Sequence, residues 1–413
     1  MAALASVETA LGLYLDPLLG QDLQSAGVTR SVVLDGAQAR VRIELGFPAA
    51  GYRERLAAQL RQHLAASCPG LAVELSVDWS IAAHAVQKGL QPLPGVRNVV
   101  AVASGKGGVG KSTVAVNFAL ALQAEGARVG ILDADLYGPS QPLRLGSRER
   151  PTSPDGRRMH PIRAHGLQAM SIGFLIESEA QPTIWRGPMA TQALWQLLTE
   201  TVWEDLDYLV VDMPPGTGDI QLSLSQKVPV AGSLVVTTPQ DVALLDARKG
   251  LEMFRKVGIP VLGIVENMST HVCTHCGHEE AIFGSGGGER LAREAGTELL
   301  GQLPLDIRIR QQADSGNPTV AADPDSALAH RYRDIARLAA ARLAYGEAAA
   351  AGFPSIAVVE GRRQRLVVLL QGLVRRQHTR RARYAAQAPG VPGAVGAQRD
   401  ADAEQQPAPL EHA

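Results

Sequence analysis

The chain has 413 residues, of which 46% are hydrophobic, enough for two or more domains with substantial cores. With 40 Lys and Arg against 41 Asp and Glu, its overall charge gives no reason to expect nucleic acid or an acidic membrane as a partner. Three cysteines cannot build a disulfide framework and fit a reducing compartment, so we expect a cytoplasmic protein. No secretion signal and no apolar run of roughly 18 residues is seen.

Residues 1–84 predict a small α+β domain, and residues 85–97, with prolines and glycines near their end, predict a linker. The Asp35-Gly36 pair between two β-rich runs is a hairpin signal. The predicted elements are a helix over 4–15, strands over 31–34 and 39–45, a helix over 53–66 and a strand over 71–77.

Residues 98–345 predict an α/β domain, because short apolar runs alternate with helical patterns. Uninterrupted apolar runs indicate strands that are buried on both faces, as in a mostly parallel twisted sheet flanked by helices. The domain closes on a helical pattern over 326–344. The predicted strands lie over 99–104, 128–133, 208–212, 233–238 and 261–267.

Residues 346–413 differ in composition from the rest of the chain. Residues 361–398 hold eight arginines and no acidic residue, and the end is rich in Ala, Pro and Gln. We expect a disordered tail. A basic patch for nucleic acid or a membrane surface is the alternative, and we assign the tail no function.

The strongest motif is GKGGVGKST at 105–113, between an apolar run and a helical pattern, which satisfies the P-loop pattern. Glycines let backbone N–H groups approach phosphate oxygens, and the following helix adds its positive dipole end. Lys111 would neutralise the β and γ phosphates, and the Ser112 hydroxyl would bind Mg²⁺. The predicted nucleotide-binding residues of this loop are Gly105, Lys106, Gly107, Gly108, Val109, Gly110, Lys111, Ser112 and Thr113.

Lys106 gives the loop a second lysine. It resembles the signature lysine of the deviant Walker A superfamily, which contains MinD, ParA and the nitrogenase iron protein. That resemblance implies that Lys106 contacts ATP across a homodimer interface and takes part in hydrolysis. The alternative is an ordinary solvated lysine.

Acidic residues end two of the predicted strands. Asp133 and Asp135 follow one strand, and Asp212 ends another before a glycine-rich segment that includes Gly216. This is the Walker B and switch arrangement, although strand-end aspartates also serve as helix caps. The superfamily pattern implies that Asp135 positions or activates the attacking water, while Asp133 and Asp212 hold Mg²⁺. Asn267, which ends the last predicted strand, resembles an adenine-reading asparagine or is a turn former.

Cys273 and Cys276 form a CxxC motif with three histidines nearby. Such a pair supplies half of a four-ligand centre. From spacing alone, three alternatives stay open: a cluster or zinc shared across a dimer, a zinc held within one chain, and redox or structural thiols. Cys68, beside Pro69, fits a half-buried structural thiol.

Together these motifs resemble the Mrp/ApbC family of iron–sulfur carrier ATPases over 98–340, and the first domain resembles the MIP18 type. The resemblance implies a homodimer in which Cys273 and Cys276 of each subunit hold a labile [4Fe–4S] cluster for transfer to apo-proteins. A MinD- or ParA-type positioning ATPase and an NTPase with structural zinc are the alternatives. One departure is FPAAG at 47–51, where the family often has a cysteine. The motifs are GKGGVGKST, DADLYGPS (133–140), IWRGPM (184–189), DMPPGTGD (212–219), TTPQDVAL (237–244), ENMS (266–269) with CxxC, FGSGG (283–287) and PLD (304–306).

Overall fold

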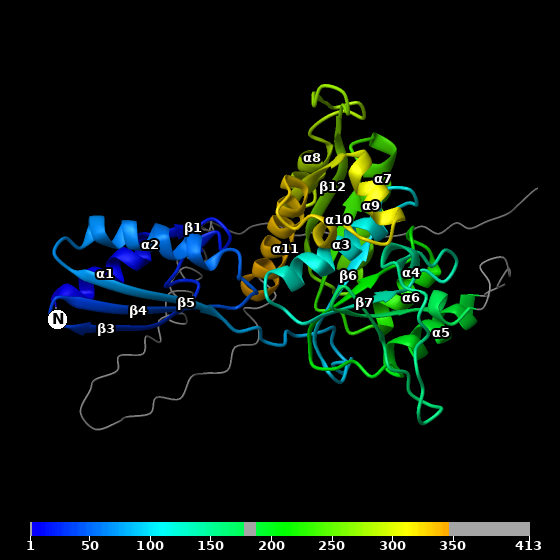
Figure 1. Ribbon diagram of the computed structural model, residues 1–413, viewed down its shortest axis with the longest axis horizontal. Coiled ribbons are helices and arrows are strands. Elements are labelled where there is room, and N and C mark those ends of the chain that lie inside the picture. The colour runs from blue at the N-terminus through cyan, green and yellow to red at the C-terminus, as the bar shows by residue number, and fades with distance from the viewer. Residues whose placement is uncertain (1, 177–186, 347–413) are drawn as a thin grey trace, which may run out of the picture. The chain divides into compact units, whose positions relative to one another are not determined.

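The computed structural model describes residues 2–176 and 187–346 (Figure 1). The predicted tail, apart from Gly346, and the first three residues of IWRGPM lie outside them. The elements are α1 (Ala2–Leu13), β1 (Leu15–Asp16), β2 (Gln21–Asp22), β3 (Thr29–Asp35), β4 (Gln38–Leu45), α2 (Arg53–Ser67), β5 (Ala72–Trp79), β6 (Val96–Ala103), α3 (Lys111–Ala124), β7 (Val129–Asp133), α4 (Gln141–Arg144), β8 (Ile162–Ala164), β9 (Leu167–Ser171), the 3₁₀ helix η1 (Ile172–Phe174), α5 (Gly187–Thr199), β10 (Leu206–Asp212), α6 (Asp219–Lys227), β11 (Gly232–Thr237), α7 (Asp241–Lys256), β12 (Val261–Val272), β13 (Glu279–Glu280), α8 (Gly287–Glu294), β14 (Leu299–Leu305), α9 (Ile307–Asp314), α10 (Thr319–Ala322) and α11 (Ala327–Tyr345).

The N-terminal domain places α1 and α2 beside the three-stranded sheet β3-β4-β5 (Figure 1). The predicted hairpin is present, because β3 and β4 pair antiparallel up to the Asp35–Gln38 pair. The strand β5 then pairs parallel to β4. Alternate β4 residues are buried against the helices, as period-two patterning requires. The small α+β domain expected from the sequence is confirmed.

The second domain contains a nine-stranded sheet, in the order β13-β12-β11-β6-β10-β7-β9-β8, with β14 also paired to β12. All pairs are parallel except β8 with β9 and β12 with β13. Every residue of β7, β10 and β11 is buried, which explains their uninterrupted apolar runs. The predicted α/β fold is thus confirmed, although β8, β9, β13 and β14 were not predicted.

Helices cover both faces of this sheet, so that successive side chains of one strand enter different cores. In β6, Val100 and Val102 join a core that contains residues of α3 and α11. Val99 and Ala101 join a second core, built with residues of α5, α6, α7 and α8. None of the helices in the described ranges is long and apolar enough to cross a lipid bilayer.

The parallel pairing brings the carboxyl ends of three strands to one edge. Asp212 at the end of β10 is in register with Asp133 of β7 on one side and with Val102 of β6 on the other. The chain leaves β6 through the glycine-rich loop and enters α3. Because ligands of open α/β sheets bind outside the carboxyl ends of the strands, this edge is where a site is expected.

The segment after β4, which departs from the family pattern, contacts Glu125 at the C-terminal end of α3. The backbone N–H of Ala50 donates to the Glu125 carbonyl at 2.9 Å, and that of Gly51 to the Glu125 carboxylate at 2.9 Å. Arg333 and Arg337 of α11 each lie 2.7 Å from the same carboxylate. Burial alone would raise the pKa of Glu125, but the two guanidinium groups outweigh it and lower that pKa.

Candidate functional site

The glycine-rich loop closes around the beginning of α3. Lys111, Ser112 and Thr113 are the first three residues of that helix, and the loop over 105–110 precedes them. Gly105 has no room for a side chain, because a Cβ there would lie 2.1 Å from the Asp246 backbone carbon. Gly110 has φ of 84°, a conformation that favours glycine. The local geometry therefore requires glycine at both positions.

Lys111 lies inside this site rather than in solvent. Its ammonium forms an ion pair with Asp212 Oδ1, and both side chains are buried. The same Nζ lies 3.2 Å from the Ser112 hydroxyl. The lysine, the hydroxyl and one strand-end carboxylate predicted from the motifs are thus brought together.

Asp133 is completely buried beside them. Its Oδ2 accepts hydrogen bonds from the backbone N–H of Ser140 at 2.9 Å and from the Ser171 hydroxyl at 3.1 Å. Burial, followed by the nearby Asp212 charge, raises the pKa of Asp133 to about 7. Two buried carboxylates share one lysine here, so the site has an excess of negative charge. A divalent cation with oxygen ligands fits that donor set.

Asp135 lies two residues further along and is only half-buried. Burial raises the pKa of its carboxyl, while Lys111 opposes that shift. Asp135 lines an open cavity between the segments that follow β7 and β10. The cavity has a volume of about 710 Å³ and is lined by Asp135, Tyr137, Gly138, Pro214, Pro215, Gly218, Asp219, Ile220 and Gln221.

Three further predicted residues lie in the loop or beside it. The Gly216 N–H donates to the Ser104 carbonyl at 2.9 Å, so in this structure it is already occupied. The Asn267 amide donates to the Val109 carbonyl at 2.8 Å, which places it against the loop. Lys106 is half-buried within the loop itself. Their predicted contacts with γ-phosphate, adenine and a second subunit stay predictions.

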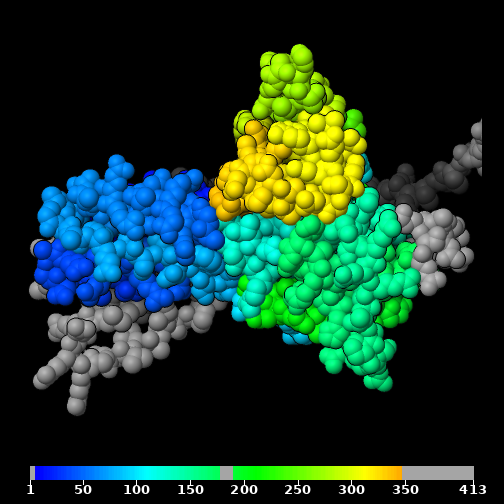
Figure 2. Space-filling view, in the orientation of Figure 1, coloured from blue at the N-terminus to red at the C-terminus, as the bar shows by residue number. Residues whose placement is uncertain are grey.

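The cysteine pair lies in the turn between β12 and β13, at the far end of the strand that carries Asn267. This hairpin projects at the top of the molecule in Figures 1 and 2, coloured yellow-green. Cys276 is exposed and Cys273 partly so. Backbone N–H groups of Cys276 and His275 donate to the Cys273 sulfur and lower its pKa.

The side chains around the cysteine pair help to distinguish a shared cluster or zinc, a zinc within one chain, and redox or structural thiols. Within residues 2–176 and 187–346, no group of three or more His, Cys, Asp or Glu side chains is placed to hold a metal ion. The neighbouring histidines therefore do not complete a site with the two thiols in one chain. The turn also does not open a helix, unlike a thioredoxin-type pair, and Cys68 is buried elsewhere.

Two polar residues of the site were not predicted from the sequence. Gln141 donates to Asp212 Oδ2 at 2.8 Å, and Ser171 donates to Asp133 as described. Gln141 directly follows the DADLYGPS segment but lies outside that motif, so the sequence offered no direct signal for it. Ser171 ends β9, a strand that the apolar pattern did not reveal.

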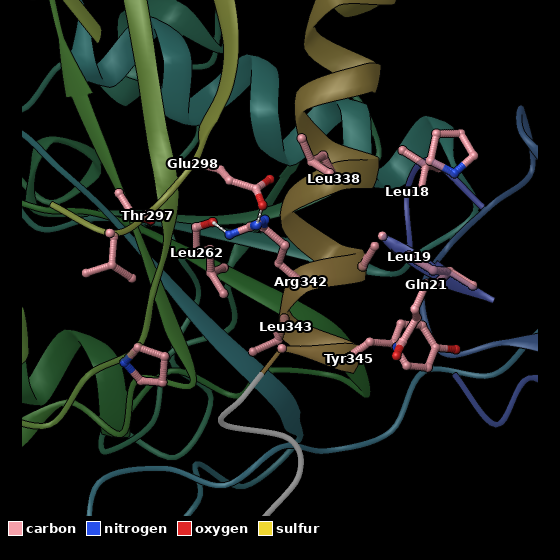
Figure 3. A pocket seen from close by; sticks show the side chains of 17 residues that line it. Leu18, Leu19, Gln21, Leu262, Thr297, Glu298, Leu338, Arg342, Leu343 and Tyr345 are labelled. Atoms are coloured by element: carbon pink, nitrogen blue, oxygen red, sulfur yellow. Dashed lines mark hydrogen bonds and ion pairs between the residues drawn. The ribbon is translucent and has the colours of Figure 1, made fainter. Parts of the chain in front are cut away.

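A second cavity, of about 630 Å³, shares no residue with this site (Figure 3). The segment over 17–21 lines one part of it, and the start of β12, the turn over 296–298 and the end of α11 line most of the rest. Its two charged side chains are paired with each other, because Arg342 forms an ion pair with Glu298 and donates to the Leu262 carbonyl at 3.4 Å. These contacts fit a packing defect between elements better than a charged-ligand site.

The sequence pattern of NUBPL iron-transfer P-loop NTPases matches residues 95–340, more than half of the chain. The chain belongs to this family. A second pattern, that of iron–sulfur cluster assembly proteins, matches residues 4–77 in the N-terminal domain. The resemblance seen in the motifs is therefore confirmed for both parts of the chain.

Named relatives match most of the chain. The NTPase is 52% identical to the iron–sulfur cluster carrier protein of Haemophilus influenzae, over 80% of this chain and 89% of that protein. It is 51% identical to the mouse iron–sulfur cluster transfer protein NUBPL, over 61% of this chain and 80% of that protein. Among solved structures, an Archaeoglobus fulgidus nucleotide-binding protein in complex with ADP is 35% identical, with a TM-score of 0.48 over 54% of this chain and 87% of that one.

Proposed function

We propose that this NTPase binds and hydrolyses ATP at the carboxyl edge of its sheet. Lys111 and the N–H groups of the glycine-rich loop would bind the phosphates. The carboxylates of Asp133 and Asp212, with the Ser112 hydroxyl, would hold Mg²⁺, which when bound supplies positive charge to the phosphate oxygens. Asp135, facing the open cavity, would orient the attacking water and accept its proton.

We further propose that Cys273 and Cys276 carry an iron–sulfur cluster as cargo for apo-proteins. The observation that carries this proposal is a solvent-accessible pair of thiols with no third protein ligand among the described residues. A four-thiolate centre then needs the same pair from a second subunit. The names and identities of the relatives support the cargo, and the Walker A lysine at position 106 supports a homodimer.

The strand β12 connects the two sites. It carries Asn267 against the glycine-rich loop and leads to Cys273 within six residues. ATP would act on the cluster only by binding one dimer geometry more tightly than another, which is a shift between two populations. We place this cycle in the cytoplasm, where thiols stay reduced.

The cargo proposal is tested by anaerobic reconstitution of the full chain with iron and sulfide. We expect broad absorption at about 400 nm and about four irons per dimer, as four thiolates on a [4Fe–4S] centre require. Cys273→Ala with Cys276→Ala should lose this iron. Cys68→Ala is the matched control, because Cys68 is a buried thiol outside the pair, and it should keep the iron.

Two results would contradict the cargo proposal. One is unchanged iron content in the double variant. The other is stoichiometric zinc in the purified protein that iron does not displace, which would favour a structural zinc. ATP-dependent co-sedimentation with vesicles or DNA, without iron binding, would instead favour a positioning ATPase.

The homodimer is tested through Lys106. Sedimentation of the wild-type protein with ATP should show a dimer, and Lys106→Ala should weaken that dimer while the monomer still binds ATP. Lys249→Ala, which removes an exposed lysine of α7, is the control. A Lys106→Ala protein that dimerises with wild-type affinity would refute the proposed contact across the interface.

A further inference from the structure

Gln141 is a buried amide in the middle of the proposed Mg–ATP site. It begins the short helix α4, eight positions after Asp133, and its side chain is 1% exposed. A glutamine amide has two donor hydrogens and one acceptor oxygen. Because buried polar groups in proteins are almost always hydrogen-bonded, each of these should have a partner.

Both donor hydrogens are used. The Gln141 Nε2 donates to the Ser112 carbonyl at 3.0 Å and to Asp212 Oδ2 at 2.8 Å. These two partners only accept, so the nitrogen of the amide must face them and the orientation of the amide is fixed. In addition, the Gln141 backbone N–H donates to Asp133 Oδ2 at 3.0 Å. One residue therefore contacts all three residues to which we assign the cation.

The acceptor oxygen is not used. Gln141 Oε1 is buried and has no hydrogen-bond partner in the described part of the chain. Covalent geometry places it about 2.3 Å from Nε2, and therefore beside the contact with Asp212. A buried acceptor without a donor is destabilising. Mg²⁺ in proteins usually retains several waters, and each of those waters is a donor.

Lys111 has two competing partners when a nucleotide is bound, the phosphates and Asp212. Asp212 is held from two sides, by Lys111 on Oδ1 and by Gln141 on Oδ2. Phosphates attract Lys111, so the attraction of the lysine for Asp212 is divided when a nucleotide is present. The neutral amide of Gln141 carries no charge for the phosphates to attract, so it keeps its hydrogen bond to Asp212.

We propose that Gln141 is a positioning residue of the magnesium–nucleotide site. Its Nε2 fixes the Asp212 carboxylate whether or not nucleotide is bound, and its Oε1 accepts a hydrogen bond from a water of the cation. This inference rests on the Mg–ATP function proposed above. It predicts that Gln141 contributes to nucleotide binding only when Mg²⁺ is present.

The test uses Gln141→Met, which keeps the length of the side chain and removes its hydrogen bonds. Calorimetry would measure binding of a non-hydrolysable ATP analogue over a series of Mg²⁺ concentrations and in EDTA. We expect the Mg²⁺ concentration for half-maximal binding to rise about ten-fold, with metal-free affinity within about two-fold of wild type. The control is Gln168→Met, which removes a buried amide whose hydrogen bonds among the described residues go to the Glu204 backbone, and it should leave both values unchanged.

A double-mutant cycle separates positioning from general packing. If Gln141 acts through Asp212, Gln141→Met should add no further shift of the Mg²⁺ midpoint in an Asp212→Asn background. Should Gln141→Met not fold, Gln141→Asn keeps the polarity but is one methylene too short, and the same shift is expected.

Two outcomes would overturn the inference: an unchanged Mg²⁺ midpoint, or equal losses of affinity with and without Mg²⁺. Wild-type protein that binds the analogue normally while Gln141→Met shows an unchanged midpoint refutes the positioning role alone. Wild-type protein that binds no analogue at any Mg²⁺ concentration refutes the ATP function and this inference together.

Discussion

The nucleotide site and the cysteine turn are built differently, although one strand joins them. Lys111, Asp133 and Asp212 are buried, and the hydrogen bonds of surrounding loops hold them in place. Cys273 and Cys276 lie in a projecting turn with little cover. A catalytic site gains from donors and charges that are already in place before substrate arrives. A site that must release its cargo gains from access, and a half-site gains from having its remaining ligands on another molecule.

The largest effect is expected at the buried nucleotide site. Lys111→Ala should reduce nucleotide affinity at least about 100-fold, because a charge-assisted phosphate contact is lost. It should also lower the free energy of unfolding by about 3 kcal/mol, since Asp212 is left buried without its cation. Calorimetry and urea denaturation measure the two effects. Lys249→Ala, which breaks an exposed ion pair, should change neither; equal stability losses in both variants would contradict the assignment.

The next effect concerns hydrolysis. Asp135→Ala should bind ATP with nearly wild-type affinity and hydrolyse it about 100-fold more slowly, since the loss removes a general base. A phosphate-release assay measures the rate, and Asp155→Ala, on an exposed turn, serves as the comparison. Wild-type turnover in Asp135→Ala would move the catalytic role to another residue.

A smaller effect is expected at the cysteines of the apo-protein. Because backbone N–H groups lower the Cys273 pKa, its thiolate should form at lower pH than that of free cysteine. Alkylation by iodoacetamide, followed by peptide mass spectrometry across a pH series, should show that Cys273 reacts at a lower pH than free cysteine does. Urea should abolish this difference in pH between Cys273 and free cysteine, because unfolding removes the backbone N–H donors. Persistence of the difference in urea would show that the turn is not its cause.

The smallest effect sharpens the contrast with Lys111. Replacing both cysteines of the pair with serine should change the free energy of unfolding by less than about 0.5 kcal/mol, as for other exposed positions. Thermal denaturation of the apo-protein measures this. A large loss of stability would mean that the turn supports the fold, and not only its cargo.

Local patterns predicted most of the fold. Fully buried strands such as β10 gave unmistakable apolar runs, and the Asp35-Gly36 turn gave the first hairpin. The strands β9 and β14 contain Gln, Ser or Pro among their apolar residues, so their patterns did not stand out. Their place in the sheet depends on pairing with β7 and β12, which one sequence does not reveal.

Most of the site was also predictable from local patterns. Lys111 and Asp212 are far apart in the chain, but the glycine-rich motif and the end of a strand each marked a position at the same sheet edge. No motif and no strand end indicates Gln141, because a glutamine after a proline- and glycine-containing loop does not by itself predict a site. Only the fold shows that its amide reaches Asp212.

The course of β12 has a mechanical consequence. Just beyond Asn267 the strand passes through Met268, whose φ of 58° interrupts the extended backbone, and its pairing with β14 shifts register there. The five residue-to-residue steps from Met268 to Cys273 span about 16 Å when extended. With Met268 as pivot, a rotation of about 10° moves the end of this lever about 3 Å. Metal–ligand distances tolerate only about 0.2 Å, so a far smaller displacement of the turn would change the geometry of the cluster that we propose two such turns hold.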